Sequence, residues 1–258
     1  MDDQNCAPIV NCLLAGSTPR VWSLLVSVFG DLVQTKDAQI SGRALTAVMD
    51  AIGVKPEALR VALFRLRKDG WIESTRSGRQ SYHRLTTWGR AQSVAASPRI
   101  YENNPAIRDA WVCVHDRNNA ANDKESGYWV SNSIAVKSRA VRSKGVFVAK
   151  VDPNLGLPDW MSDKICPLSV VAQTRDLTRR LAACERILRK SPAMSNLQVA
   201  VLRVLVVHEW RRIILKVPEL PDFTFPKGWQ GTTCREHVYD LLESHPRVDL
   251  SMLEAETA

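Results

Sequence analysis

Residues 56–71 carry the strongest structural signal in this chain and read Pro56-Glu57-Ala58-Leu59-Arg60-Val61-Ala62-Leu63-Phe64-Arg65-Leu66-Arg67-Lys68-Asp69-Gly70-Trp71. Proline suits the first turn of a helix because the N–H it lacks would have no partner there, and Asp69-Gly70 ends the helix. At about 100° per residue, four apolar side chains cluster on one side: Leu59, Ala62, Leu63 and Leu66. The opposite side carries mainly cations, together with Val61 and Phe64. The pattern predicts a helix that packs by one side and offers a basic side to a partner.

Two further helices are predicted before this segment and a β-hairpin after it. Residues 21–33 are apolar around most of a helix, and residues 42–52 follow the capping residue Ser41 and end at Gly53. Residues 71–76 and 81–86 alternate as strands around a basic tip, Ser77-Gly78-Arg79-Gln80. Three helices followed by a hairpin with arginine at its tip form the layout of a winged helix-turn-helix, whose third helix enters the major groove of DNA.

This layout predicts which residues touch DNA. Arg60, Phe64 and Arg65 are expected in or beside the major groove, where arginine reads base edges and an apolar side chain meets a thymine methyl. The other expected contacts flank that helix or lie on the wing, and reach phosphate or the groove beside the wing: Lys55, Arg67, Lys68, Arg76, Arg79 and Gln80. The alternative is a module of the same layout that contacts only protein.

Basic residues concentrate in two segments of the chain. Its 258 residues include 35 Lys and Arg against 27 Asp and Glu, which gives a formal net charge of +8. Residues 54–90 hold nine basic and three acidic residues, and residues 137–190 hold twelve and five. Two such blocks indicate two places where anions are held, whereas a single basic block is more often a solvated face.

The composition also excludes several classes of protein. No stretch approaches the roughly 18 apolar residues of a membrane span, and the N-terminus lacks the charge pattern of a secretory signal. The cysteines form no C-x-x-C pair and are interpreted as buried or idle thiols of a reducing cytoplasm: Cys6, Cys12, Cys113, Cys166, Cys184 and Cys234. No catalytic motif appears. We therefore expect a cytoplasmic binding protein, not an enzyme, with no metal, cofactor, catalytic residue or membrane contact.

Three segments resemble one family of regulators. The first, residues 23–31, ends in Phe29-Gly30-Asp31. The second joins residues 60–71 to the wing and its closing strand, residues 78–86, and to Gly89-Arg90. The third is His208-Glu209-Trp210-Arg211-Arg212, followed by Asp222 and by Lys227-Gly228-Trp229-Gln230-Gly231. In these segments the chain resembles the phenylacetic-acid degradation repressor family, the PaaX-type transcriptional regulators.

The resemblance implies a repressor of an aromatic-acid, phenylacetate-type catabolic operon that an aryl-CoA effector releases from its double-stranded DNA operator. A homodimer is expected, because specific sites commonly consist of two half-sites about one helical turn apart. The rival hypothesis is an enzyme that processes a CoA thioester and uses its N-terminal module for protein contacts.

The same resemblance implies effector-binding candidates in the C-terminal part: His208, Arg211, Arg212 and Trp229. As ligands, the two arginines would hold the phosphates of CoA, since guanidinium forks match phosphate oxygens. As structural residues, they would pair with acids such as Glu209 or Glu236, and the tryptophan would belong to the core. Both interpretations stay open at this point, and the structural one is favoured.

The expected fold class is α+β. Residues 1–18 are predicted as an N-terminal tail, 19–97 as the winged helix-turn-helix, 98–172 as a small α/β middle domain and 173–258 as a helical domain. A linker is expected from Ser97-Pro98 to Asn104-Pro105. The middle domain should contain strands at 110–115, 128–130 and 146–151 and a helix from Asn132 or Ser133 to Ser143, which is ferredoxin-like by analogy with the family. The last domain should contain helices at 174–190, 196–217 and 234–244.

Overall fold

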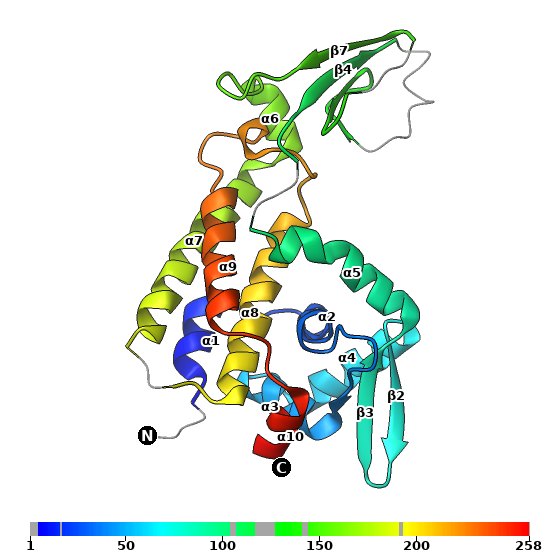
Figure 1. Cartoon of the computed structure of the whole chain (residues 1–258), viewed down its shortest axis with the longest axis vertical. Helices are drawn as coiled ribbons and strands as arrows, with labels where there is room; N and C mark the ends of the chain where they lie inside the picture. The colour runs from blue at the N-terminus through cyan, green and yellow to red at the C-terminus, as the bar shows by residue number, and fades with distance from the viewer. Residues whose placement is uncertain are drawn as a thin grey trace.

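The structure is a computed structural model that describes residues 5–15, 17–103, 107–116, 127–140, 144–190 and 193–257. It is a mixed α/β protein with two antiparallel sheets. In Figure 1 a group of short helices and a projecting hairpin lie at one end, the second sheet lies at the other, and long helices run between them. Among the described residues, no helix is long and apolar enough to span a membrane.

The three predicted helices of the N-terminal part are confirmed as α2 (Val21–Leu32), α3 (Gly42–Ala51) and α4 (Pro56–Lys68). The hydroxyl of Ser41 accepts a hydrogen bond from the Ala44 N–H at 3.2 Å, as the predicted cap of α3 requires. The hairpin is confirmed as β2 (Ile72–Ser77) and β3 (Gln80–Leu85). A short strand, β1 (Ile40–Ser41), pairs with β3 and completes a sheet of order β1-β3-β2.

Helix α5 (Thr87–Tyr101) follows the hairpin and corrects the expected linker. Its cap, Thr86, accepts a hydrogen bond from the Gly89 N–H at 3.0 Å. Glycine is required at 89 because a Cβ there would lie 2.2 Å from the Trp71 carbonyl oxygen. The linker prediction is wrong from Ser97 to Tyr101, since the helix passes through Pro98 and buries Ile100 beyond it. Residues 104–106, including Asn104 and Pro105, lie outside the described residues.

The middle sheet consists of β4 (Trp111–His115), β5 (Tyr128–Trp129), β6 (Ile134–Lys137) and β7 (Val146–Lys150). Its order is β5-β6-β4-β7, and all neighbours are antiparallel. The three predicted strands are confirmed, but the helix expected from Asn132 or Ser133 is wrong where β6 lies. The Ser131 hydroxyl accepts from the Ile134 N–H at 3.1 Å and forms a turn into that strand. Val136 then pairs with Val112 of β4. The cross-strand pairing outweighs the local helix signal. Residues 117–126 and 141–143, with Ser143, lie outside the described residues.

The C-terminal part is helical, as predicted, and α8 is its centre. It contains α6 (Asp159–Ile165), α7 (Leu168–Leu188), α8 (Asn196–Ile214), the short 3-10 turn η2 (Asp222–Thr224), α9 (Gly231–Ser244) and α10 (Leu250–Glu256). Helices α7 and α9 begin earlier than predicted, and α6 and α10 carried no prediction. Residues 200–210 of α8 are all buried, because helices surround it.

Helices near both ends of the described chain pack on this body. The expected tail, residues 1–18, contains α1 (Ala7–Leu14), which packs on α7 and α8 and buries Leu13 completely. At the other end, α10 lies beside α3 (Figure 1). The Glu254 carboxylate accepts from the Ser41 N–H at 3.0 Å, and that of Glu256 accepts from the Asn196 N–H at 2.9 Å. The predicted N-terminal tail is therefore a helix at residues 7–14, whose apolar face α7 and α8 cover.

A buried ion pair joins the N-terminal and C-terminal parts. The carboxylate of Asp31, at the end of α2, accepts two hydrogen bonds of 2.9 Å from the Arg203 guanidinium of α8. The Tyr101 hydroxyl of α5 donates to the same carboxylate at 3.1 Å, and Arg247 donates at 3.3 Å. The remaining Arg203 donors reach the carbonyls of Leu242 and His245. One carboxylate thus holds α2, α5, α8 and the segment after α9 together.

We expect Asp31→Ala to lower the free energy of unfolding by about 3–5 kcal/mol, because it leaves the Arg203 guanidinium buried without its counter-charge. Urea unfolding followed by circular dichroism measures this loss. The matched control is Glu73→Ala, which removes an exposed ion pair with Arg84 of 2.8 Å and should cost about 1 kcal/mol or less. Equal losses of stability in the two variants would contradict the conclusion that Asp31 and Arg203 form a buried ion pair that stabilises the fold.

Candidate nucleic-acid interface

The basic side of α4 faces solvent. Three apolar side chains anchor the helix in the core: Leu59, Ala62 and Leu66. The side chain of Arg60 is 77% exposed, and its guanidinium lies 4.0 Å from the carboxylate of Glu57. Val61 and Phe64 are 54% and 60% exposed. The other predicted contacts on or next to this helix are exposed as well: Lys55, Arg65, Arg67 and Lys68. This cationic face is open to a large anionic partner.

The hairpin β2–β3 projects from the body of the protein beside α4 (Figure 1). Its turn uses Gly78, whose positive φ of 59° suits glycine. Arg76 donates to the Gly78 carbonyl at 3.2 Å, and both it and Arg79 are exposed. Gln80 is half-buried, and its side-chain oxygen accepts from the Tyr82 hydroxyl at 3.0 Å. The tip therefore presents two cations, while Gln80 is held by a neighbour in the sheet.

A hollow of about 460 Å³ between the wing and the start of α3 adds a residue that sequence reasoning missed. Arg43 and Arg79 both line it. The start of α3 lies close to strand β3 of the wing, because a Cβ at Gly42 would lie 2.6 Å from the Ser81 hydroxyl. Arg43 is the only basic residue of α3, so no cluster of charges marks it in the sequence. Its one sequence signal is its position two residues after the cap Ser41. Pairing of β1 with β3 brings it to the wing.

Comparison with known proteins fits this geometry. The family model of the PaaX-like protein matches residues 20–89, and that of the PaaX-like protein C-terminal domain matches residues 169–247. The chain belongs to the PaaX family. The transcriptional repressor PaaX of Escherichia coli (strain K12) is 27% identical over 243 residues, which cover 83% of this chain and 77% of that protein. The first PaaX match spans α2 to β3, and the second spans α7 to α9.

Two effector candidates in the second PaaX match, His208 and Arg211, lie where α8 meets α2. The Nδ1 atom of His208 is 3.1 Å from the Ser27 hydroxyl. Arg211 donates to that hydroxyl at 2.7 Å and to the Ser23 hydroxyl at 2.8 Å. The partners of Arg211 are serines of α2 and not the acids that the structural interpretation names, and these contacts join α8 to α2.

The environment of these two residues sets their charges. Burial, together with the nearby charges of Arg211 and Arg212, lowers the pKa of His208 to about 3, so the imidazole is neutral at pH 7. Burial and the charge of Arg212 lower the pKa of Arg211 to about 10, which leaves its guanidinium charged. The junction between α2 and α8 therefore carries a positive charge.

The other two effector candidates lie apart from this pair. Arg212 is 47% exposed and lies 3.4 Å from the carboxylate of Glu209, the partner that the structural interpretation names. Trp229 packs on Phe225 with their ring centroids 4.7 Å apart. Arg211 lines a cavity between α2, α5 and α8 whose lining includes none of the other three candidates. The four candidates therefore do not converge on one ligand site.

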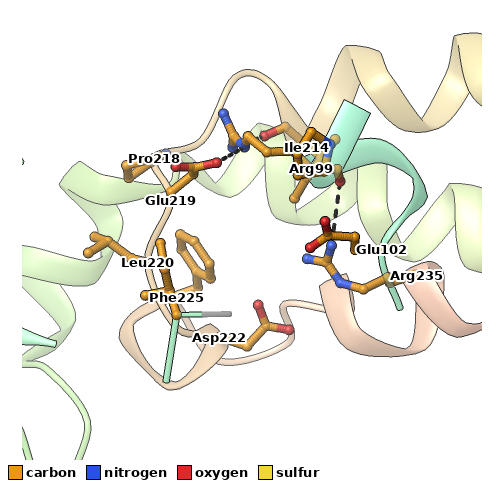
Figure 2. Close-up of a pocket in the computed structure, with 11 residues that line it drawn as sticks. Arg99, Glu102, Ile214, Pro218, Glu219, Leu220, Asp222, Phe225 and Arg235 are labelled. Atoms are coloured by element: carbon orange, nitrogen blue, oxygen red, sulfur yellow. Dashed lines mark hydrogen bonds and ion pairs between the residues drawn. The ribbon is translucent and has the colours of Figure 1, made fainter. Parts of the chain in front are cut away.

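A second cavity, of about 180 Å³, lies among α5, the segment after α8 and α9 (Figure 2). The Arg99 guanidinium is 3.4 Å from the carboxylate of Glu219 and also donates to the Val217 carbonyl at 2.7 Å. Arg235 donates to the Arg99 carbonyl at 3.5 Å, and the carboxylates of Glu102 and Asp222 also line the space. This cavity therefore carries acidic groups beside its two arginines.

The described residues contain no group of three or more His, Cys, Asp and Glu side chains that could hold a metal ion. Burial raises the pKa of the Cys166 thiol to about 11, and mainly burial raises those of Cys184 and Cys234 to about 12. These three cysteines are protonated near neutral pH and are weak nucleophiles.

We expect the stability of the protein to depend on His208 below pH 6.5. In the unfolded chain this imidazole binds a proton near pH 6.5, and in the folded protein only near pH 3, so its contribution to stability is lost as the pH falls between these values. Between about pH 6 and pH 4.5 the free energy of unfolding should fall more steeply in the wild type than in His208→Gln, by up to about 1.4 kcal/mol per pH unit. Urea unfolding at a series of pH values compares the slopes, and parallel curves would contradict the prediction.

Proposed function

We propose that this chain is a transcriptional repressor that recognises a double-stranded DNA operator through a winged helix-turn-helix formed by α2, α3, α4, β2 and β3. The observation that carries the proposal is the outward cationic face of α4 beside a hairpin with arginine at its tip. An α-helix with such a face fits the major groove, and a basic hairpin reaches the adjacent backbone or minor groove. The relative in Escherichia coli is named a transcriptional repressor.

The residues divide by role in this proposal. Arg60, Phe64 and Arg65 lie in or beside the major groove, where they specify the sequence. The remaining residues position the protein on phosphate or in the groove beside the wing: Lys55, Arg67, Lys68, Arg76, Arg79 and Gln80. Arg43 joins this second group because it shares the hollow with Arg79.

Regulation follows the PaaX family in the same proposal. The operon serves aromatic-acid catabolism of the phenylacetate type, and an aryl-CoA effector releases the protein from DNA. The protein acts as a homodimer on two half-sites and is not an enzyme. The middle sheet has the strand order of a ferredoxin-like fold, β5-β6-β4-β7, which supports a small α/β middle unit. In the proposed division into residues 19–97, 98–172 and 173–258, the two boundaries move to the end of α5 and the start of α7, because these helices cross them.

A gel-shift series on the chain's own upstream DNA tests the function. We expect retention of that DNA, weakening as salt rises, and release by phenylacetyl-CoA. Absence of DNA retention, with turnover of the thioester at enzyme-like rates, would replace this proposal by a CoA-thioester enzyme. DNA retention that phenylacetyl-CoA does not change would keep the repressor and remove the aryl-CoA effector.

Arg60→Ala should weaken binding to the operator by about 1–3 kcal/mol and relax specificity at one base position, because this arginine reads a base edge. The measurement is a fluorescence-anisotropy titration against the operator and against copies with single base changes. The matched control is Arg189→Ala, which removes an arginine with 78% side-chain exposure just after α7. An unchanged operator affinity in Arg60→Ala would contradict the role.

Arg79→Ala and Arg43→Ala should weaken operator and unrelated DNA evenly, because contacts to phosphate carry no sequence information. Each variant should lower the slope of log affinity against log salt by about one. Titrations at four salt concentrations measure this slope. A loss confined to the operator sequence would assign these arginines to base reading instead.

A further inference from the structure

The cavity between α2, α5 and α8 has an apolar wall. Its volume is about 250 Å³, and it lies where the proposed DNA-binding unit meets the C-terminal helices. The apolar lining comes from all three helices and from Trp71: Val26, Ala96, Ile100, Val207 and Leu215. Most binding cavities for small molecules are apolar spaces of this kind with a few polar groups that set the orientation of the ligand.

Arg211 supplies the cation of the lining, whose other polar members are Ser27, Gln92, Ser93, Ser97 and Tyr101. Its Nε atom donates to the Ser27 hydroxyl and its Nη2 atom to Ser23, so both are committed to the packing of α8 on α2. No described residue accepts a hydrogen bond from its Nη1 atom, although Arg211 lines the cavity. A guanidinium group at such a partly enclosed site favours an anionic acceptor, because hydrogen bonds between charged groups are stronger than those between neutral groups.

The charges around the two cavities point to different ligands. The lining of the α2/α5/α8 cavity contains no carboxylate, and the nearby Asp31 is already neutralised by Arg203 and Arg247. The cavity of Figure 2 has the carboxylates of Glu102, Glu219 and Asp222 in its lining, which repel an anion. The α2/α5/α8 cavity is therefore the better of the two for an acid.

The volume limits the size of that acid. A dry apolar cavity of about 150 Å³ holds benzene, so one of about 250 Å³ holds a ring or branched chain of roughly ten non-hydrogen atoms. The cavity is partly open to the surface, so this limit applies to the part of a ligand that lies inside it.

We propose that the α2/α5/α8 cavity binds a small apolar carboxylic acid, a ring or branched chain of roughly ten non-hydrogen atoms, whose carboxylate accepts hydrogen bonds from Arg211 Nη1. The acid contacts α2 of the DNA-binding unit and α5 and α8 behind it, so its binding changes the packing that positions α4. This regulatory consequence, unlike the binding itself, rests on the proposed function.

Isothermal titration of the full chain with phenylacetate as the probe tests the binding without DNA. We expect saturable 1:1 binding, and about ten-fold weaker binding of the uncharged phenylacetamide, because it lacks the charge that pairs with Arg211. Ala96→Phe fills the cavity and should lower the affinity about ten-fold or more, whereas Ala95→Phe, at an exposed neighbour on α5, should not. Arg211→Gln should weaken binding in the same way, and the exposed Arg212→Gln should not.

Circular dichroism and the melting temperature check that each variant is folded. The proposal is overturned if folded Ala96→Phe binds phenylacetate as the wild type does, if the amide binds as well as the acid, or if only the CoA thioester binds. A wild type that retains DNA but binds no acid removes this inference and leaves the repressor function intact. A wild type that binds the acid through this cavity but retains no DNA keeps the site and removes the proposed function.

Discussion

The bidentate pair of Asp31 with Arg203 is the interaction on which the placement of the N-terminal unit against the C-terminal helices depends. The carboxylate is fully enclosed, and every donor around it belongs to another element: α5, α8 or the segment after α9. A charge in such a place is tolerated only when its partners are present and well oriented. The N-terminal unit is therefore held in one orientation against the C-terminal helices. Because α4 belongs to that unit, the same contacts fix the direction in which its cationic face points.

A second set of polar contacts between α2 and α8 lies beside the Asp31–Arg203 pair. His208 and Arg211 on α8 reach Ser27 and Ser23 on α2, one to two turns before Asp31. Because the imidazole is neutral and the guanidinium is charged, this junction combines hydrogen bonding with one buried positive charge. The two matches to PaaX family models contain one side of this junction each. The resemblance at both ends of the chain thus corresponds to two surfaces that meet in the folded protein.

The arginines of the exposed basic surface and the arginines of the junction have different roles. The arginines of α4 and the wing are exposed and make few contacts within the protein, so their charges are available to a partner. Arg203 and Arg211 donate hydrogen bonds to groups on neighbouring segments and hold helices together. Positive charge alone does not distinguish these two roles, because all of these residues are arginines. Their exposure does: the side chain of Arg60 is 77% exposed and that of Arg203 is 4% exposed.

The sequence by itself determined the elements whose signal is local. The apolar side of α4, the cap Ser41, the place of Pro56 in the first turn of α4 and the turn at Gly78 each depend on residues a few positions apart, and the sequence predicts all of them. The basic residues predicted on α4 are exposed for the same reason, since a helix that buries one side turns the other outward.

Only the tertiary structure decided the rest. Asp31 and Arg203 are 172 positions apart, and Ser27 and His208 are 181 apart, so no period or motif relates them. Residues 134–137 became a strand because β4 lies beside them, and residues 7–14 became a buried helix because α7 and α8 cover them. Arg43 reaches the wing only through the pairing of β1 with β3. The physical reason is the same throughout: periodicity and capping act between neighbours in the chain, whereas the partner of a buried polar group or an edge strand is chosen by packing between distant segments.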